Sequence, residues 1–423
     1  MPALHGDRGP FDEQDVKASS HPGFLDELID ADDPGAPASL ADTRGMHRSN
    51  RPKVKTRYFD PKRIGLSMSG GGYRATLFHA GVVIRLNEWG LLGHIDRISS
   101  VSGGSITAGI LATGWSKLTF DTSGVATNLK EHFTDRIIAA TQLNIDVRTG
   151  LAGFVPFVSA GNFLAGVYDK RIFGQTLLRD LPVRPKFIFN ASNLQTGGLF
   201  RFTRDYLADW RALYITNHYH TVGEAVAASS AFPTVLSPVR LDIAGTDETD
   251  PDRVRFHDPV LREKAVLVDG GVYDNLGLEA IWKHCGIVIA SYSGWNYGAD
   301  TTRFARIDRQ TLAVVNSFLA SSIDWRERML IKLFQNWLPD DLPERTGAYW
   351  TAETDIDNFD VSFGWRPDPG VYEKARNSPT RLKSLWREEQ IPVIHAGYAY
   401  ADAAIRCYLL PGLPASSGAP EIF

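Results

Sequence analysis

The chain is poor in cysteine, with two among its 423 residues. Cys285 and Cys407 cannot build a disulfide framework or supply the four ligands of a structural zinc site. We therefore expect both to be reduced thiols of a cytoplasmic protein. An excess of basic charge is also missing, because the formal net charge is −4. Nucleic acid is therefore not an expected partner.

Long apolar runs are absent as well. No uninterrupted apolar segment reaches the roughly 18–20 residues of a membrane span. Residues 1–33 contain neither an apolar signal core nor a basic transit helix. We expect a protein made without a secretion signal, whose membrane contact, if any, is peripheral.

Differences in composition and pattern along the sequence divide the chain into three parts. Residues 1–52 are rich in Asp, Pro, Gly, Ser and His, which favours a mobile or loosely packed arm. Residues 53–300 carry the apolar strand patterns of an α/β domain. Residues 301–423 are predicted to form a helical extension packed on that domain, because a long amphipathic pattern runs from Leu312 to Trp337. The apolar, glycine-rich segment 150–168 suits a lid or a wall of a substrate pocket, or equally a core-packing loop.

An alternation of strand and helix begins at residue 64. Apolar strand patterns at 64–69 and 95–101 each lead into a small-residue turn and then into a helical pattern, at 74–89 and 106–111. This βαβα order predicts a parallel sheet whose functional loops lie at the carboxyl ends of the strands.

Three glycine-containing turns follow such strands, and together they suit acyl transfer. Ser102 can be the nucleophile, on a tight turn between strand and helix. Asp269, which leaves a buried strand, can be the base. The N–H groups of Gly71, Gly72 and Gly103 can stabilise an oxyanion. Taken singly, each turn is also ordinary turn chemistry.

Several other residues could form a different kind of site. The glycine run lacks both nucleotide-binding spacings, Gly-x-x-x-x-Gly-Lys-Ser/Thr and Gly-x-Gly-x-x-Gly, so we expect no nucleotide cofactor. Arg74 could fix the loop or bind a substrate phosphate. A conventional triad through a histidine stays open. The pair His218-x-His220 has no third ligand nearby, and no metal is expected. The histidines considered for the triad are His79, His218, His220 and His284.

The ordered motifs resemble the patatin-like phospholipases. They are Ser-Gly-Gly-Gly-Tyr-Arg at 69–74, Ser-x-Gly at 102–104 and Asp-Gly-Gly at 269–271, supported by Asn-Leu at 275–276 and Ala-Ser-Ser-Ala-Phe-Pro at 228–233. The resemblance implies a three-layer α/β sandwich with a mainly parallel sheet. It also implies hydrolysis of fatty-acyl esters by a Ser102–Asp269 dyad without a catalytic histidine, with Gly70, Gly71 and Gly72 as the oxyanion loop.

Two positions depart from the family pattern. Ser100 stands where the usual Gly-x-Ser-x-Gly elbow has its first glycine, and Gly277 stands where the neuropathy-esterase-like branch, the nearest in motif style, often has proline. Neither change removes a catalytic group. They leave substrate preference and turnover open.

The sequence therefore predicts a lipid acyl hydrolase of the phospholipase A or lysophospholipase type, a serine hydrolase acting on a phospholipid or another acyl ester. Two alternatives remain at this stage: a carboxylesterase for small or neutral-lipid esters, and a lipid-binding module with little turnover. Headgroup, acyl position, chain length and oligomeric state are left open by the sequence.

Overall fold

The computed structural model describes residues 59–145, 160–233, 236–243, 247–248, 254–294, 307–335 and 345–422. The expected arm, residues 1–52, lies outside the described residues, as does 150–159 of the apolar segment. Residues Asp60–Phe423 form one compact unit, which holds both the α/β part and the C-terminal part. No helix in the described ranges combines the length and apolarity that crossing a bilayer requires.

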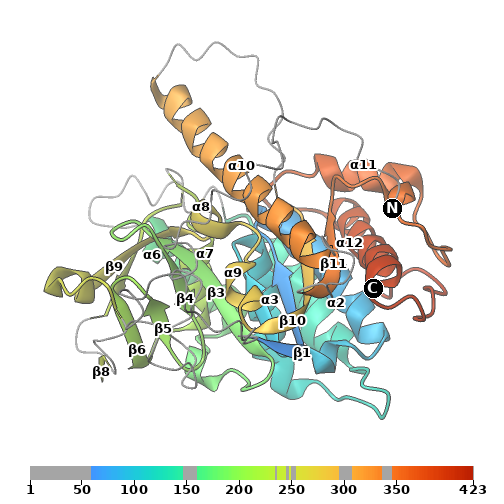
Figure 1. The fold of residues 1–423 in the computed structure, drawn as a ribbon, viewed down its shortest axis with the longest axis horizontal. Helices are drawn as coiled ribbons and strands as arrows, with labels where there is room; N and C mark the ends of the chain where they lie inside the picture. Colours follow the sequence, from blue (N-terminus) through green and yellow to red (C-terminus); the bar gives the residue numbers. More distant parts are fainter. Residues whose placement is uncertain are drawn as a thin grey trace, which may run out of the picture. The chain divides into compact units, whose positions relative to one another are not determined.

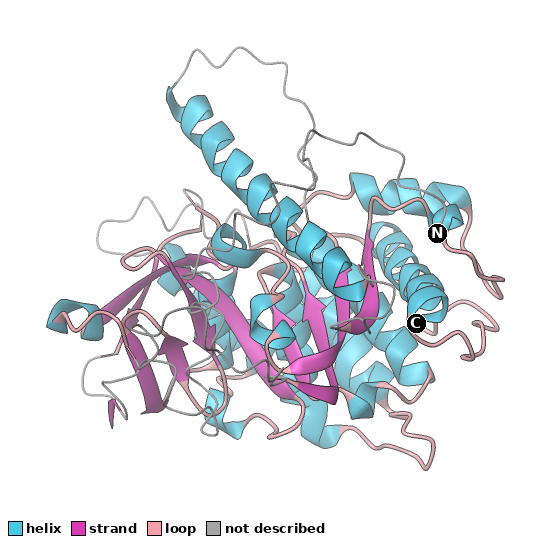
Figure 2. Ribbon diagram, in the orientation of Figure 1, coloured by secondary structure: helices cyan, strands magenta, loops and turns pink. Residues whose placement is uncertain are grey.

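One mixed sheet runs through the molecule (Figure 2). Its main path is β11-β10-β1-β2-β3-β4-β5-β6-β8, and β9 joins β3 to β7. The strands are β1 (Asp60–Met68), β2 (Arg97–Ser100), β3 (Lys186–Asn193), β4 (Gly198–Phe202), β5 (Leu207–Asp209), β6 (Leu213–Asn217), β7 (Val239–Asp242), β8 (Asp247–Glu248), β9 (Lys264–Asp269), β10 (Cys285–Tyr292) and β11 (Thr346–Thr351).

Helices cover both faces of the sheet (Figure 1). α2, α3, α7 and α12 pack together on one face, and α8 and α9 lie on the other. The helices are α2 (Gly72–Glu88), α3 (Gly103–Gly114), α4 (Asp135–Thr141), α6 (Ala160–Tyr168), α7 (Val222–Ser229), α8 (Gly271–Asp274), α9 (Glu279–Trp282), α10 (Ile307–Phe334), α11 (Pro369–Asn377) and α12 (Arg387–Tyr408). The predicted three-layer α/β fold is confirmed.

The centre of the sheet is parallel, as predicted. β11, β10, β1, β2 and β3 all pair in parallel, and the strands beyond β3 pair antiparallel. β2 is short and ends opposite Phe189 of β3, and β9 then takes its place on the same strand, with Asp269 opposite Ala191. This register brings the end of β2 and the end of β9 together, and the two turns that follow them share one sheet edge.

The C-terminal part is helical, as expected, but it also adds β11 to the edge of the central sheet beside β10. α12 packs against α2, where a Cβ atom on Gly397 would lie 1.9 Å from the Phe78 carbonyl oxygen. Only glycine permits this close crossing. Asp402 of α12 also pairs with Arg85 of α2 across the same contact, at 2.7 Å.

Candidate active site

Ser102 stands on a strained turn between β2 and α3. Its φ of 50° and ψ of −118° lie in a region that residues other than glycine rarely adopt. The Ser102 N–H donates to the Ser229 hydroxyl at 2.9 Å, which holds the turn from α7. The nucleophile elbow expected from the sequence is therefore present in the backbone, with the serine at the positive end of α3.

Ser100 has a defined place beneath this elbow. Its hydroxyl accepts a hydrogen bond from Ser105 at 3.0 Å and donates to the Ile188 carbonyl of β3 at 3.2 Å. Ser105 in turn contacts the Ser229 hydroxyl at 2.8 Å. The serine at the usual glycine position thus belongs to a hydroxyl chain that ends at the Ser102 amide.

Asp269 is the partner of Ser102. It is 5% exposed, and its carboxylate accepts a hydrogen bond from the Gly271 N–H at 2.7 Å. Burial raises the pKa of Asp269 to about 6, and the Gly271 N–H and the nearby Ser102 hydroxyl oppose part of that rise. The carboxylate is therefore a stronger base than an exposed aspartate.

The glycine run between β1 and α2 faces the same point. Gly71 and Gly72 have φ values of 138° and 56°, and both line the cavity beside Ser102. Within the described ranges, no acceptor is found for the N–H groups of Gly71, Gly72 and Gly103. The Gly70 N–H donates to the Asn275 carbonyl at 3.2 Å, so Gly70 does not supply the oxyanion donor expected of it.

A cavity of about 860 Å³ contains the two candidate catalytic side chains. Its floor is formed by the glycine loop, Ser102 and Asp269. α10 contributes one face to its wall, through Leu319, Ala320 and Ile323 among others. The sequence predicted the amphipathic helix but not that it would line this site.

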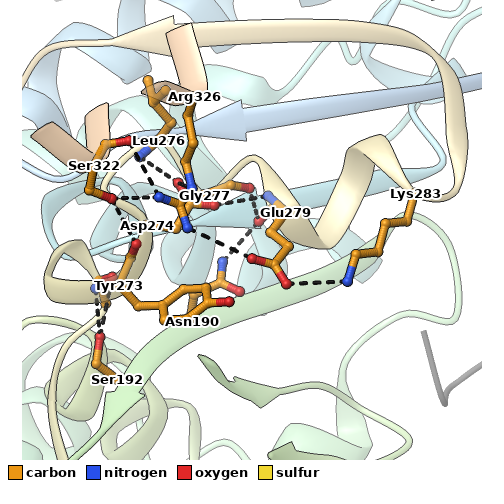
Figure 3. A network of polar contacts seen from close by, with 12 residues as sticks. Asn190, Ser192, Tyr273, Asp274, Leu276, Gly277, Glu279, Lys283, Ser322 and Arg326 are labelled. Carbon is orange, nitrogen blue, oxygen red and sulfur yellow. Dashed lines mark hydrogen bonds and ion pairs between the residues drawn. The ribbon is translucent and has the colours of Figure 1, made fainter. Parts of the chain in front are cut away.

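Polar contacts fasten α10 to the turn that follows Asp269 (Figure 3). Arg326 pairs with the buried Asp274 at 3.2 Å, and the Ser322 hydroxyl donates to the Tyr273 carbonyl at 2.9 Å. Asp274 also accepts the N–H groups of Leu276 and Glu279. The helix that covers the cavity and the loop that carries the candidate base are therefore held as one assembly.

Arg74 does not reach the cavity. Its guanidinium is 4% exposed and donates to the carbonyl oxygens of Ser293, Gly294, Arg376 and Ser378. These contacts tie α2 to the segment after β10 and to the end of α11. Of the two roles considered, fixing the loop matches this geometry, and the expected substrate contact is not met.

The histidines lie away from the cavity. His79 is fully buried between Ser291, at 3.1 Å, and the Ser69 carbonyl, at 3.0 Å, and burial lowers its pKa to about 4. His220 pairs with Glu224 on α7. None of the histidines considered for a triad lines the cavity. The described cavity wall therefore offers Asp269, and no histidine, as the base for Ser102.

Sequence reasoning named Ser229 and Asn275 within motifs but did not predict their supporting roles. Ser229 lies in a motif that the sequence singled out, but its bond to the Ser102 amide depends on the packing of α7. The side chain of Asn275 leaves no room for a Cβ on Gly70, because its Oδ1 would lie 2.4 Å from that atom. The apolar segment 150–168 is described only from Ala160, as α6, and none of α6 lines the cavity.

Comparison with known proteins identifies the family. A family model described as patatin-like phospholipase matches residues 66–282, more than half of the chain. The chain belongs to the patatin-like phospholipase family. The match runs from β1 to α9 and so includes Ser102, Asp269 and the glycine loop. Within the family, the difference at Gly277 has a structural basis, because its φ of 64° is one that proline cannot adopt.

Individual relatives are more distant. The protein named "Putative meiotic phospholipase SPO1" from Saccharomyces cerevisiae is 46% identical over 46 residues, which are 11% of this chain and 7% of the yeast protein. Human GIVD cytosolic phospholipase A2 is 12% identical with a TM-score of 0.47, covering 82% of this chain and 59% of its own. VipD from Legionella pneumophila is 16% identical with a TM-score of 0.34, covering 86% and 72%. The family model, and not these likenesses, carries the family assignment.

Proposed function

We propose that the protein hydrolyses carboxylic esters of lipids, as a phospholipase A or a lysophospholipase, with Ser102 as nucleophile and Asp269 as base. The observation that carries the proposal is the placement of Ser102 and the buried Asp269 carboxylate in one largely apolar cavity, next to backbone donors and near enough for the Ser102 hydroxyl to lower the pKa of Asp269. A phospholipase family supplies the substrate class. A soluble protein acting peripherally at a lipid surface fits this proposal.

Acylation begins when the Ser102 Oγ attacks the ester carbonyl carbon while Asp269 takes the hydroxyl proton. The carbonyl oxygen becomes an oxyanion, which the N–H groups of Gly71, Gly72 and Gly103 stabilise together with the positive ends of α2 and α3. When the intermediate collapses, the C–O bond to the alcohol breaks, and Asp269 returns its proton to the leaving oxygen. The acyl group is then bound to Ser102.

Deacylation repeats these steps with water. Asp269 takes a proton from the water whose oxygen attacks the acyl carbon, the same N–H groups bind the new oxyanion, and the bond to Ser102 Oγ breaks. Ser102 regains its proton from Asp269, and the fatty acid leaves. The strained Ser102 backbone keeps the nucleophile in place throughout.

Two substitutions test the dyad. Ser102→Ala removes the nucleophile, and we expect turnover of phospholipid micelles and of short aryl esters to fall by about 10⁴-fold or more. Asp269→Asn keeps the shape but not the base, and a loss of about 10²–10⁴-fold is expected. Circular dichroism checks that both variants fold. Wild-type turnover by either folded variant would overturn the dyad.

The two alternatives make different predictions for the same assay. A carboxylesterase for small esters would show its highest kcat/KM on short acyl chains and no gain on long ones. A lipid-binding module would bind vesicles without releasing fatty acid. The 860 Å³ cavity favours long acyl chains, so we expect kcat/KM to rise with chain length.

A further inference from the structure

The cavity has two chemically different sides, and Ser102 lies between them. On the side of β9 it is apolar, with Phe232, Leu236 and Val272 in its wall. Phe232 and Leu236 follow α7, whose end is joined to β9 where the Asp269 N–H donates to the Ala231 carbonyl at 2.9 Å. An acyl chain fits this side, because burial of methylene groups there is favourable.

The opposite side is built by β10 and β11 and is polar. Tyr292 ends β10, Tyr349 lies on the neighbouring β11, and Glu353 follows that strand. The sheet order places β10 and β11 beyond β1, away from β9. α10 crosses above and adds Asp324 and Glu327 to the same lining. Three carboxylates and two phenol rings therefore gather on one side of the nucleophile.

These groups influence one another electrostatically. Burial raises the pKa of Glu327, and the negative charge of Asp324 raises it further. Beyond the effect of burial, the charges of Glu327 and Asp324 raise the pKa values of Tyr349 and Tyr292. Among the described residues that line the cavity, Arg381 is the only basic one, and its side chain is exposed. The buried Arg74 interacts electrostatically with Glu353 and Tyr292, and Arg328 lowers the pKa of Glu327, so these two cations offset part of the charge. Because neither cation lines the cavity, the lining on this side presents mainly negative charge to a ligand.

A buried hydroxyl on this side also lacks a partner. The Tyr349 hydroxyl is shielded from solvent, lines the cavity and makes no hydrogen bond to any part of the chain that the structure describes. A buried polar group of this kind is costly unless a ligand satisfies it. Phenol rings beside carboxylates are also the surroundings that bind organic ammonium ions, through the ring faces and the negative charges.

We infer that this side of the cavity binds the ammonium group of a lipid headgroup of the choline or ethanolamine type. The inference rests on the proposed function and names the substrate class of the same site. The acyl chain lies against Phe232 and Leu236, the ester lies at Ser102, and the ammonium group lies among Glu327, Glu353 and Tyr349. The exposed Arg381 is the cation available to the phosphate of such a zwitterion.

Headgroup preference is the first test. Phosphatidylcholine, phosphatidylethanolamine and phosphatidylglycerol with matched acyl chains are presented at the same surface fraction in neutral detergent micelles, and fatty-acid release is measured. We expect kcat/KM for the choline or ethanolamine lipid to exceed that for the glycerol lipid by at least about tenfold. Equal rates, or a faster rate on the glycerol lipid, would overturn the inference while leaving the proposed function standing.

Two variants locate the preference. Glu327→Gln removes one charge without changing size, and the ratio of kcat/KM for choline over glycerol lipid should fall about tenfold. Tyr349→Phe removes only the hydroxyl and should lower the ratio severalfold. Glu373→Gln, an exposed glutamate of α11 outside the cavity wall, is the matched control and should leave the ratio unchanged. A ratio that does not respond to Glu327→Gln would contradict the inference.

A binding measurement separates the inference from catalysis. Dodecylphosphocholine and dodecylphosphoglycerol contain no carboxylic ester, and calorimetry below their micelle concentrations compares their affinities for the full chain. We expect at least tenfold tighter binding of the choline compound, and a loss of that difference in Glu327→Gln. Equal affinities overturn the headgroup site. Failure of the wild-type protein to cleave any ester overturns only the proposed function.

Discussion

Asp269 combines two properties that oppose each other. Asp269 is only 5% exposed, and such burial disfavours its charged form. The same burial raises its pKa to about 6, which makes the carboxylate a stronger base. The folded state holds its proton more tightly than the unfolded chain. Its contribution to stability is therefore full below pH about 4 and is lost as the pH rises to about 6. At neutral pH the ionised, buried Asp269 therefore lowers the free energy of unfolding, while the same burial makes it a stronger base.

The activity should depend on the same pKa, but it should rise with pH over the range in which the stability contribution falls. Asp269 acts as a base only when ionised, so we expect kcat/KM for a short aryl ester to be constant near neutral pH and to fall tenfold per unit below pH about 6. A short ester is the right probe because it carries no titrating headgroup. A profile that stays flat to pH 4.5 would show that a buried Asp269 is not the base.

At the residue scale, the candidate catalytic residues were easier to predict than the residues that hold them in place. Ser102, Asp269 and the glycine loop could be proposed as candidates because each follows a strand pattern with a small-residue turn. The roles of Ser100 and Ser229 could not, because their hydroxyl chain joins β2, α3 and α7, which are distant in sequence. Arg74 was misjudged as a substrate contact for the same reason, since its acceptors follow it by 219 to 304 positions.

At the scale of elements, the contact of α2 with α12 joins the start of the catalytic fold to its C-terminal part. The pair of Asp402 with Arg85 is buried, and Arg406 adds a second contact to the other carboxylate oxygen at 3.0 Å. The same interface contains the close crossing at Gly397. α2 was predicted from its pattern at 74–89, but its partner α12 could not be, since periodicity gives a face and not the element that covers it.

Removing the shared carboxylate should therefore be costly. Asp402→Asn removes the carboxylate that pairs with Arg406 and one of the two, beside Glu88, that pair with Arg85. We expect the free energy of unfolding to fall by about 3–5 kcal/mol in urea titrations. Asp357→Asn is the control, because Asp357 also pairs with an arginine, Arg366 at 2.6 Å, but is 66% exposed. No measurable change is expected there. Equal effects of the two substitutions would refute the importance of the buried cluster.

At the scale of the whole molecule, the α/β core and the C-terminal part share one cavity. The βαβα order in the sequence predicts the parallel centre of the sheet, and the structure confirms it. β11 and the antiparallel strands beyond β3 were not predicted, because edge position and pairing partner depend on distant segments. The consequence is functional: α10 and β11 supply the wall on which the inferred headgroup preference depends.

The central claim is that Ser102 is a nucleophile activated within this cavity. The most direct measurement is to treat the full chain with a long-chain alkyl fluorophosphonate and to locate the adduct by peptide mass spectrometry. The account predicts one stoichiometric adduct on Ser102, none in Ser102→Ala, and labelling of the folded Asp269→Asn variant at least 100-fold slower. Absence of an adduct on Ser102, or equally fast labelling of Asp269→Asn, would contradict it.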